Sequence, residues 1–253
     1  FFMGILLDDG FSFGLGAFET IAVEHGTPIF LEQHLQRLRT AAAFLQIDFS
    51  AAGITQQTVH DYLENQQEDL SHCALKVVLT PRNTLFRLRK NPYTQQSYQH
   101  GFSVDISPVR RNDTSPLIKY KTLNYGDCII EKRAAAAAGK QERIFLNTKG
   151  QICEGTVSNI FFAREGKIVT PPLSCGMLPG ILRGFVCETT DVQERILYPQ
   201  DIATFDECFV TNSLMGIMPV HDLNGIVFSS RAVSKTLQEK YHAACVHQQT
   251  ALY

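Results

Sequence analysis

Two lysines that are candidates for chemistry lie two residues apart in the segment "LIKYKTLNY", residues 117–125. In an extended strand, residues i and i+2 point to the same face, so the pattern predicts that Lys119 and Lys121 lie side by side. Lysine is rarely fully buried without a partner, and a solvated edge is therefore the ordinary reading for both. Local alternation does not separate a reactive lysine from a surface one here.

The second candidate for a functional residue is a carboxylate among apolar residues. Glu154 lies in "LNTKGQICEGTVSNIFF", residues 146–162, beside several apolar residues. Burial of an ionised carboxylate costs free energy unless a cation or hydrogen-bond donors meet it, so Glu154 is either turned toward water or paired for a reason. Because an unpaired glutamate is mostly exposed, its immediate neighbours favour a solvated turn.

Three further features could bind an anion such as phosphate. The segment "LPGILRG", residues 178–184, begins a helix after a Gly/Pro turn, and the first NH groups of a helix lack intrahelical partners. Thr211, Asn212 and Ser213 group hydroxyl, amide and backbone donors after the strand "ECFV". Arg37, on a predicted helix, could add positive charge. Without a bound anion, the helix start would be capped by water, the Thr-Asn-Ser segment would be a simple turn, and Arg37 would be a surface residue.

The composition of the whole chain bounds its partners. The chain has 253 residues, is 44% hydrophobic and carries a formal charge of -2. This length suits one large α/β domain or two modest ones with a real core. The charges are spread along the chain without a polybasic field, so we expect a small-molecule substrate, no nucleic acid and no membrane partner. The apolar run Phe1–Leu7 is too short to cross a bilayer and predicts a first strand.

Cysteine and histidine usage favours neither disulfides nor a metal. The seven cysteines are odd in number, widely spaced and mostly embedded among apolar residues, and no C-x-x-C occurs. We therefore expect reduced thiols in a cytoplasmic protein. The eight histidines form no ligand pattern, since His242 and His247 are five apart and His34 stands alone on a helical pattern. We expect no metal site.

Periodicity predicts a mixed α and β first half. A hairpin is expected over about residues 19–30. The next helix has a buried stripe formed by Leu31, Leu35, Leu38, Ala42 and Leu45. A second helix is expected at about residues 55–67, and strands at residues 74–80, 84–89 and 102–109.

The stretch "RRNDTSP", residues 110–116, has the composition of a linker, so the predicted domains span residues 1–109 and 117–253. The second half begins with a short extended piece and a helix at about residues 124–138, closed by Gly139. The further expected elements are strands at residues 142–147, 159–163 and 167–169, a helix at 180–188, strands near 195, 208 and 220, and a final helix at 230–247.

The order of these segments resembles that of a known enzyme class. "FSFGLGAFET" and "HLQRL" are followed by "KTLNY", "EGTVSNIFF", "TPPLSCGMLPGILR" and "NSLMGIMPV". Together they resemble the fold-type IV pyridoxal-phosphate enzymes, which include branched-chain and D-amino-acid aminotransferases and 4-amino-4-deoxychorismate lyase. The resemblance runs over nearly the whole chain. It implies an α/β (α+β) fold of two domains, a smaller N-terminal α/β domain and a larger C-terminal pseudo-barrel domain.

The resemblance also implies a cofactor, pyridoxal 5'-phosphate, and its ligands. Lys121 would form the Schiff base and then move the proton, whereas Lys119 has no counterpart. Glu154 would pair with the pyridine nitrogen and keep it protonated, so that the ring accepts electrons. The remaining implied cofactor ligands are Arg37, the backbone NH groups of Ile181 and Leu182, Asn212 and Ser213 around the phosphate, and Tyr125 and Asn159 near the ring.

Within the class, "NSLMGIMPV" and Phe18-Glu19-Thr20 look most like the aminodeoxychorismate lyases. That resemblance implies a β-elimination that converts 4-amino-4-deoxychorismate to 4-aminobenzoate and pyruvate, a step toward folate, with Lys121 removing the C4 proton. Thr20 is a candidate to assist proton delivery to the leaving group. A hairpin threonine favoured by strand propensity is an equally good account of Thr20.

Substrate carboxylates need a cation, and Arg89 in "LRKNPY" is the first candidate, with Arg87 and Arg82 behind it. Phe18 is the second substrate-binding candidate. In this region the chain departs from the Gly-rich "RGY"-like segment of many lyases, which leaves the substrate open.

Two other functions stay open. An aminotransferase acting on a branched-chain or D-amino acid would use the same lysine and cofactor with a keto-acid acceptor. A binding or scaffold protein that lost the chemistry is the third, and the joint presence of Lys121, Glu154 and Arg37 argues against it. The resemblance further implies a homodimer with the active site near the interface and between the two domains.

Overall fold

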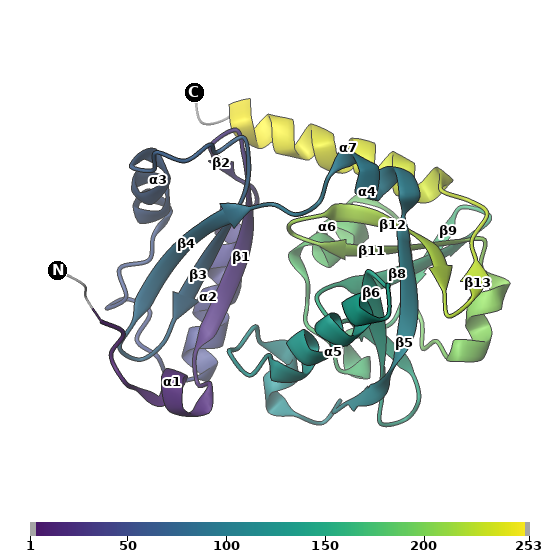
Figure 1. Ribbon diagram of the computed structural model, residues 1–253, viewed down its shortest axis with the longest axis horizontal. Helices are drawn as coiled ribbons and strands as arrows, with labels where there is room; N and C mark the ends of the chain where they lie inside the picture. The colour runs from purple at the N-terminus through teal and green to yellow at the C-terminus, as the bar shows by residue number, and fades with distance from the viewer. Residues whose placement is uncertain (1–3, 251–253) are drawn as a thin grey trace. The chain divides into compact units, whose positions relative to one another are not determined.

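The computed structural model describes residues 4–250, which divide into two compact units (Figure 1). Within the described residues, the first unit comprises 4–92, 120–125 and 245–250, and the second comprises 93–119 and 126–244. Residues 93–109, which the sequence analysis assigned to the N-terminal domain, cluster with the second unit. Strand β5 (Phe102–Arg111) also runs through the first two residues of the predicted linker.

The first unit is a four-stranded antiparallel sheet with helices on one face. The strands are β1 (Ala17–Glu24), β2 (Thr27–Pro28), β3 (His72–Leu79) and β4 (Thr84–Lys90), in the order β2-β1-β3-β4. Helices α2 (Leu31–Phe44) and α3 (Gln56–Glu64) follow β2, and α1 (Asp9–Phe13) precedes β1. Leu35 and Leu38 of α2 pack with Ile21 and Val77 of the sheet in one buried core. Side chains alternate along a strand, so Phe18 and Thr20 lie on the opposite face.

The second unit is a sheet that closes on itself. Strands pair in the order β8-β11-β12-β5-β6-β7, and β7 pairs again with β8. The bounds are β6 (Glu142–Asn147), β7 (Ile152–Gly155), β8 (Asn159–Arg164), β11 (Glu207–Asn212) and β12 (Gly216–Leu223). Strands β9 (Lys167–Thr170), β10 (Val192–Glu194) and β13 (Ile226–Val227) extend this sheet. Closure removes exposed strand edges, and it confirms the predicted pseudo-barrel.

Helices surround the closed sheet. Helix α5 (Gly126–Ala137) packs against β5 and β6, α6 (Ile181–Thr189) against β11, and α4 (Gln95–His100) against β12. Helix α7 (Ala232–Thr250) is the last element, and short 3-10 helices occupy Pro116–Lys119, Leu173–Cys175 and Pro199–Thr204. No helix within residues 4–250 is long and apolar enough to span a membrane. No group of three or more His, Cys, Asp or Glu side chains in that range is placed to hold a metal ion.

Most of the expected elements are confirmed, and the exceptions have physical causes. The predicted strand over residues 1–7 is wrong where it is described: residues 4–7 form no strand, and the backbone of Leu6 bonds instead to the side chain of Asn83. Residues 1–3 lie outside the described range. The extended piece predicted before Lys121 is a 3-10 helix that ends at Lys119, so Lys119 and Lys121 do not share a strand face.

Candidate active site

A row of three polar side chains crosses the closed sheet of the second unit. Glu154 of β7 pairs directly with Asn159 of β8, and Asn159 pairs directly with Thr211 of β11. Directly opposed residues on antiparallel strands point to the same face. All three side chains are buried, although polar groups cost free energy when they are buried without partners.

Glu154 is paired rather than solvated, so the reading from its neighbours alone was wrong. It is 5% exposed. Its Oε1 atom lies 3.0 Å from Arg111 Nη2 and accepts from Arg111 Nε at 3.1 Å. Its Oε2 atom accepts from the backbone NH of Leu178 at 3.0 Å. A carboxylate held in this way has one charged partner and fixed donors, which offset the cost of its burial.

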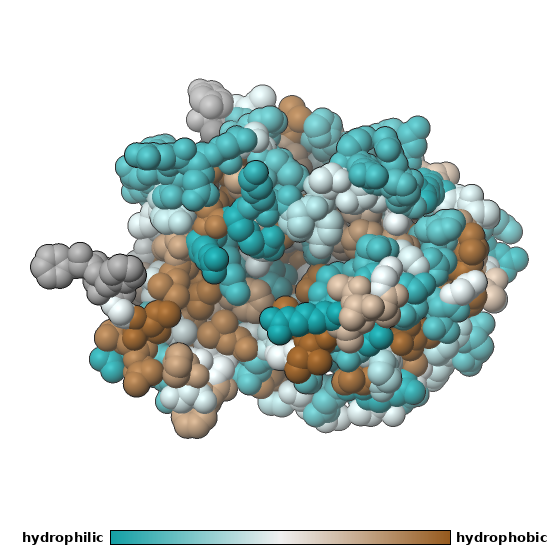
Figure 2. Space-filling view, in the orientation of Figure 1, coloured by the Kyte–Doolittle hydropathy of each residue, from teal (hydrophilic) through white to brown (hydrophobic). Residues whose placement is uncertain are grey.

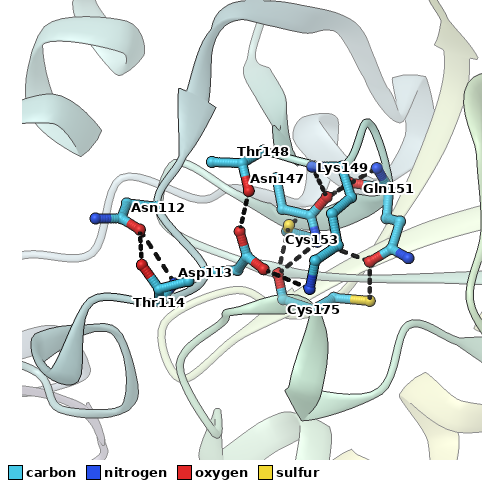
Figure 3. Close-up of polar contacts among 9 residues, drawn as sticks. All are labelled: Asn112, Asp113, Thr114, Asn147, Thr148, Lys149, Gln151, Cys153 and Cys175. Carbon is cyan, nitrogen blue, oxygen red and sulfur yellow. Dashed lines mark hydrogen bonds and ion pairs between the residues drawn. The ribbon is translucent and has the colours of Figure 1, made fainter.

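The backbone near Arg111 is anchored by a polar network shown in Figure 3. Asp113 accepts from Thr148 at 2.5 Å and pairs with Lys149 at 3.0 Å; the hydrogen bond from Thr148 and the contact with Lys149 lower the pKa of Asp113 to about 2. Gly176 packs so tightly on Asp113 that a Cβ at this glycine would lie 2.5 Å from the Asp113 Cα. The segment that carries Arg111 is thereby fixed against two loops.

Asn159 connects the row to the start of helix α6. Its Nδ2 donates to the carbonyl of Leu178 at 3.0 Å. A Cβ on Gly180 would lie 2.0 Å from Asn159 Oδ1, so only glycine fits there. Gly180 is the N-cap of α6, and no side chain caps the helix. The predicted ligands Ile181 and Leu182 are the first two residues of α6, where backbone NH groups lack intrahelical acceptors.

Asn212 and Ser213 lie at the other end of the row, where β11 ends. Asn212 donates to the carbonyl of Val157 at 3.1 Å, and its Oδ1 accepts from the NH groups of Leu214 and Met215, each at 2.9 Å. These contacts fix the backbone on both sides of Ser213.

The donors of the second unit fit the predicted cofactor. The Oγ1 atom of Thr211 is buried and has no hydrogen-bond partner among the described residues. An unpaired hydroxyl near the end of β11, with α6 packed on that strand and the start of α6 free of a side-chain cap, suits a phosphate group. Glu154 supplies the carboxylate that a protonated pyridine nitrogen requires.

Lys121 lies in the first unit beside aromatic rings. Its Nζ is 4.6 Å from the ring centroid of Phe18 and 4.9 Å from that of Tyr125, and these two rings meet edge to face. Its carbonyl accepts from Phe18 NH at 2.9 Å, which aligns the segment with β1. Lys121 is half-buried, whereas Lys119 is exposed. Phe18 and Tyr125 are thus both placed beside the predicted reactive amine.

Arg37 is held by a buried carboxylate that the sequence analysis did not identify. Arg37 donates from Nε to Glu19 Oε1 at 2.7 Å and from Nη2 to Glu19 Oε2 at 2.6 Å. Glu19 Oε2 also lies 2.7 Å from His34 Nδ1. Burial raises the pKa of Glu19, but the charge of Arg37 and then His34 outweigh it and bring that pKa to about 2. Burial also lowers the pKa of His34. The two hydrogen bonds to Glu19 fix the position of the Arg37 guanidinium.

The face of the first sheet opposite helices α2 and α3 carries a row of cations, called the cationic row below. Thr20 of β1 pairs with Lys76 of β3, and Lys76 pairs with Arg87 of β4, so the three side chains share one face. Arg89 lies two residues further along the same face of β4. Burial, then Arg89 and Arg87, lower the pKa of Lys76. Among the described residues, none of these three cations forms an ion pair with a carboxylate.

Arg82, the third arginine considered for substrate binding, is engaged elsewhere. Its backbone NH donates to Asp8 at 2.9 Å, and its side chain donates to the carbonyl of Leu7 at 3.3 Å. These contacts tie the turn after β3 to the segment before α1.

Three residues of the candidate site, Glu19, Lys76 and Arg111, were not predicted from the sequence. The sequence pattern could have indicated the first two but not the third. Glu19 alternates with Ala17 and Ile21, so strand periodicity already placed a carboxylate in the core. Lys76 likewise interrupts the apolar run of β3. Arg111 carries no local signal that distinguishes it from the preceding arginine.

Comparison with known proteins agrees with this geometry. The family model described as amino-transferase class IV matches residues 16–223. A relative from Methanocaldococcus jannaschii named "Putative branched-chain-amino-acid aminotransferase" is 30% identical over 93% of this chain and 89% of its own. "Aminodeoxychorismate lyase" of Bacillus subtilis is 25% identical over 90% and 84%.

A solved structure from Legionella pneumophila, titled "Putative 4-amino-4-deoxychorismate lyase", superposes with a TM-score of 0.83 at 28% identity and covers 95% of both chains. The fold, the family match and the arrangement of the polar row agree. The chain therefore belongs to the class IV aminotransferase family of pyridoxal-phosphate-dependent enzymes.

Proposed function

We propose that the protein is a carbon-oxygen lyase that converts 4-amino-4-deoxychorismate to 4-aminobenzoate and pyruvate. The observation that carries this proposal is the cationic row of the first unit, in which Lys76, Arg87 and Arg89 have no carboxylate partner within residues 4–250. The proposed substrate has two carboxylates and so requires more than one cation. A branched-chain amino acid has one carboxylate, whereas the acceptor 2-oxoglutarate has two, so an assay without a keto acid is needed to separate the two activities.

The chain's own residues have distinct roles in this proposal. With the cofactor bound, Lys121 would hold its aldehyde carbon and give up that bond to the 4-amino group of the substrate. The freed amine would take the C4 proton, and its renewed attack on the same carbon would release 4-aminobenzoate. Thr20, beside Lys76, delivers a proton to the departing enolpyruvyl oxygen, and Phe18 provides the ring against which the Lys121 amine is held. Arg89 and Arg87 bind substrate carboxylates, with Lys76 as a third cation.

The proposed cofactor ligands hold pyridoxal 5'-phosphate at its two ends. When bound, the cofactor supplies an electron sink for the carbanion left by proton removal. Glu154, which pairs with Arg111 at 3.0 Å, would hold the pyridine nitrogen in its protonated form. Asn159 and Tyr125 contact the ring. Arg37, Ser213, Asn212 and the NH groups of Ile181 and Leu182 bind the phosphate.

The alternative is an aminotransferase for a branched-chain or D-amino acid, and the M. jannaschii relative favours it. The two activities differ in their need for an acceptor. We expect the purified protein, loaded with pyridoxal phosphate, to release equal amounts of pyruvate and 4-aminobenzoate from 4-amino-4-deoxychorismate without a keto acid. Strict dependence on 2-oxoglutarate, with glutamate as product, would establish the aminotransferase instead. The variant Lys121→Ala should abolish either reaction and the borohydride-reducible adduct.

We further propose that the protein is a cytoplasmic homodimer. All seven cysteines are free thiols, as in a reducing compartment. Apolar surface gathers over the α1 end of the first unit in Figure 2, where Leu7, Phe11 and Phe13 are each more than two thirds exposed. Contiguous apolar surface of this kind supports association of subunits. Light scattering after size-exclusion chromatography should give about twice 28.3 kDa, and a monomer would contradict this proposal.

A further inference from the structure

Glu142, the first residue of β6, is a buried carboxylate that the proposed reaction does not use. It is 0% exposed. Its Oε1 accepts from the NH and hydroxyl groups of Thr156, with the NH at 3.1 Å, and its Oε2 accepts from the hydroxyl of Ser158 at 2.9 Å and the NH of Val157 at 3.4 Å. Lys132 lies 3.7 Å away. The carboxylate therefore accepts a hydrogen bond from each residue of the 156–158 turn between β7 and β8.

That turn joins Glu154 and Asn159, two of the three members of the polar row. It begins just after Glu154 and ends at Asn159, and the NH of Gly155 donates to the carbonyl of Ser158 at 2.6 Å. A Cβ on Gly155 would lie 2.1 Å from Ser158 Oγ, so the turn is packed without room for change. The position of this turn sets the position of both strand residues.

The same turn also reaches the end of β11. The carbonyl of Val157 accepts from Asn212 Nδ2 at 3.1 Å, and Asn212 in turn holds the NH groups of Leu214 and Met215. A continuous chain of hydrogen bonds thus runs from Glu142 through the turn to the backbone on both sides of Ser213. Both oxygens of Glu142 accept hydrogen bonds from the turn, so this carboxylate has a structural contact with the site and not a direct one with the cofactor.

We infer that Glu142 is a positioning residue for the cofactor site: its carboxylate holds the 156–158 turn, and the turn places Glu154, Asn159 and the loop at Ser213. This inference rests on the proposed pyridoxal-phosphate function. Loss of the charge, as in Glu142→Gln, puts an amide NH2 against the hydrogen-bond donors of the turn. The turn shifts, and the phosphate-binding loop shifts with it.

A matched control is available on β11. Glu207 is 1% exposed, and its carboxylate accepts from the NH groups of Val233 and Ser234 and the hydroxyl of Ser230, at 2.9, 2.6 and 3.1 Å. It holds the start of α7, at the opposite end of β11 from Asn212. Glu207→Gln makes the same chemical change in an equally buried carboxylate without touching the 156–158 turn.

The test compares Glu142→Gln, Glu207→Gln and wild type in thermal unfolding of the apoprotein, in fluorescence titration with pyridoxal phosphate, and in the 31P NMR shift of the bound phosphate. We expect both variants to lower Tm, and Glu142→Gln alone to weaken binding by about tenfold or more and to move the 31P signal. Ser158→Ala, which removes a single donor, should weaken binding by less.

Each outcome decides the inference. Wild-type affinity and an unmoved 31P signal in Glu142→Gln would overturn it, as would equal loss of affinity in Glu207→Gln. If Glu142→Gln does not fold, unchanged affinity in Ser158→Ala overturns the inference and weakened affinity supports it. A wild-type protein that binds no pyridoxal phosphate would instead refute the proposed function itself.

Discussion

Glu154 and Asn159, directly opposed on β7 and β8, hold the two polar backbone groups of one residue. The NH of Leu178 donates to Glu154 Oε2, and the carbonyl of Leu178 accepts from Asn159 Nδ2, each at 3.0 Å. A proposed ligand of the pyridine nitrogen and a proposed ring neighbour thereby fix the chain two residues before the N-cap of α6. The carboxylate position and the helix start are mechanically linked, because a shift of Leu178 strains both contacts.

The charge of Glu154 is expected to matter more for catalysis than for binding. In Glu154→Gln the amide oxygen can still accept from Leu178, but it cannot stabilise a protonated pyridine nitrogen. We expect kcat to fall by about 100-fold or more, with cofactor still bound and its visible absorbance maximum shifted. Stopped assays and absorbance spectra of the loaded protein measure both effects.

Glu131→Gln is the control for the Glu154 variant. Glu131 is also buried and pairs with Arg143 at 2.9 Å in the same unit. Both substitutions leave an arginine without its carboxylate, so both should lower Tm. Only the Glu154 variant should change the absorbance maximum, and an equal change in both would contradict the assigned role.

Gly180 is expected to tolerate no side chain. In Gly180→Ala the new Cβ would lie 2.0 Å from Asn159 Oδ1 and must displace either that side chain or the start of α6. We expect cofactor affinity, measured by fluorescence titration, to fall by about tenfold. The control is Gly184→Ala in the same helix, where the nearest atom is 3.9 Å from the new Cβ. Removing a helix-interior glycine there should raise stability by about 0.5–1 kcal/mol with affinity unchanged.

Sequence patterns predicted the helices and strands that have a regular apolar periodicity. They failed for segments whose structure depends on contacts with residues far away in the sequence. The helix over residues 31–44 has a regular apolar stripe and was predicted correctly. Helix α4 was missed because it has no buried residue and hence no stripe. The apolar residues 4–7 were taken for a strand, yet Leu7 remains exposed, since apolar composition alone does not supply a strand to pair with.

In the candidate site, too, residues within short motifs could be predicted, whereas contacts between distant residues could not. The positions of Lys121 and Glu154 followed from the order of short motifs, which sequence shows directly. Whether Glu154 is solvated or paired could not be read from its neighbours, because its partner Arg111 lies 43 residues away at the end of β5. That pairing follows from the strand order, in which β6 lies between β5 and β7 and pairs with both.

Acid should remove the stability contributed by Glu19. The pKa of Glu19 is lowered from 4.5 to about 2 in the folded protein, so its ionised form favours folding above pH 4.5 and that contribution is lost as the pH falls toward 2. A shift of about 2.5 pH units corresponds to roughly 3 kcal/mol. We expect Glu19→Gln to lower the free energy of unfolding by about this amount at pH 7. Urea titrations should show the gap closing below pH 4.5, and a gap that stays constant down to pH 2.5 would refute the assignment.

We expect Lys76 to contribute to substrate binding while it lowers the stability of the folded protein. Its pKa is lowered by burial and by Arg89 and Arg87, so its charged form is less favourable in the folded protein than in the unfolded chain. Lys76→Met should therefore leave Tm unchanged or raise it, while the KM for a substrate with two carboxylates rises by about tenfold. Thermal unfolding and steady-state assays at fixed ionic strength measure the two effects.

The control for Lys76 is Lys90→Met, which removes the same charge from the opposite face of the sheet. Lys90 pairs with Cys73, and Cys73 belongs to the buried core beneath α2. A general effect of net charge on an anionic substrate would raise KM equally in both variants. A substrate site at the cationic row raises KM in Lys76→Met alone. A lower Tm together with an unchanged KM in Lys76→Met would show that this lysine supports the fold and does not bind the substrate.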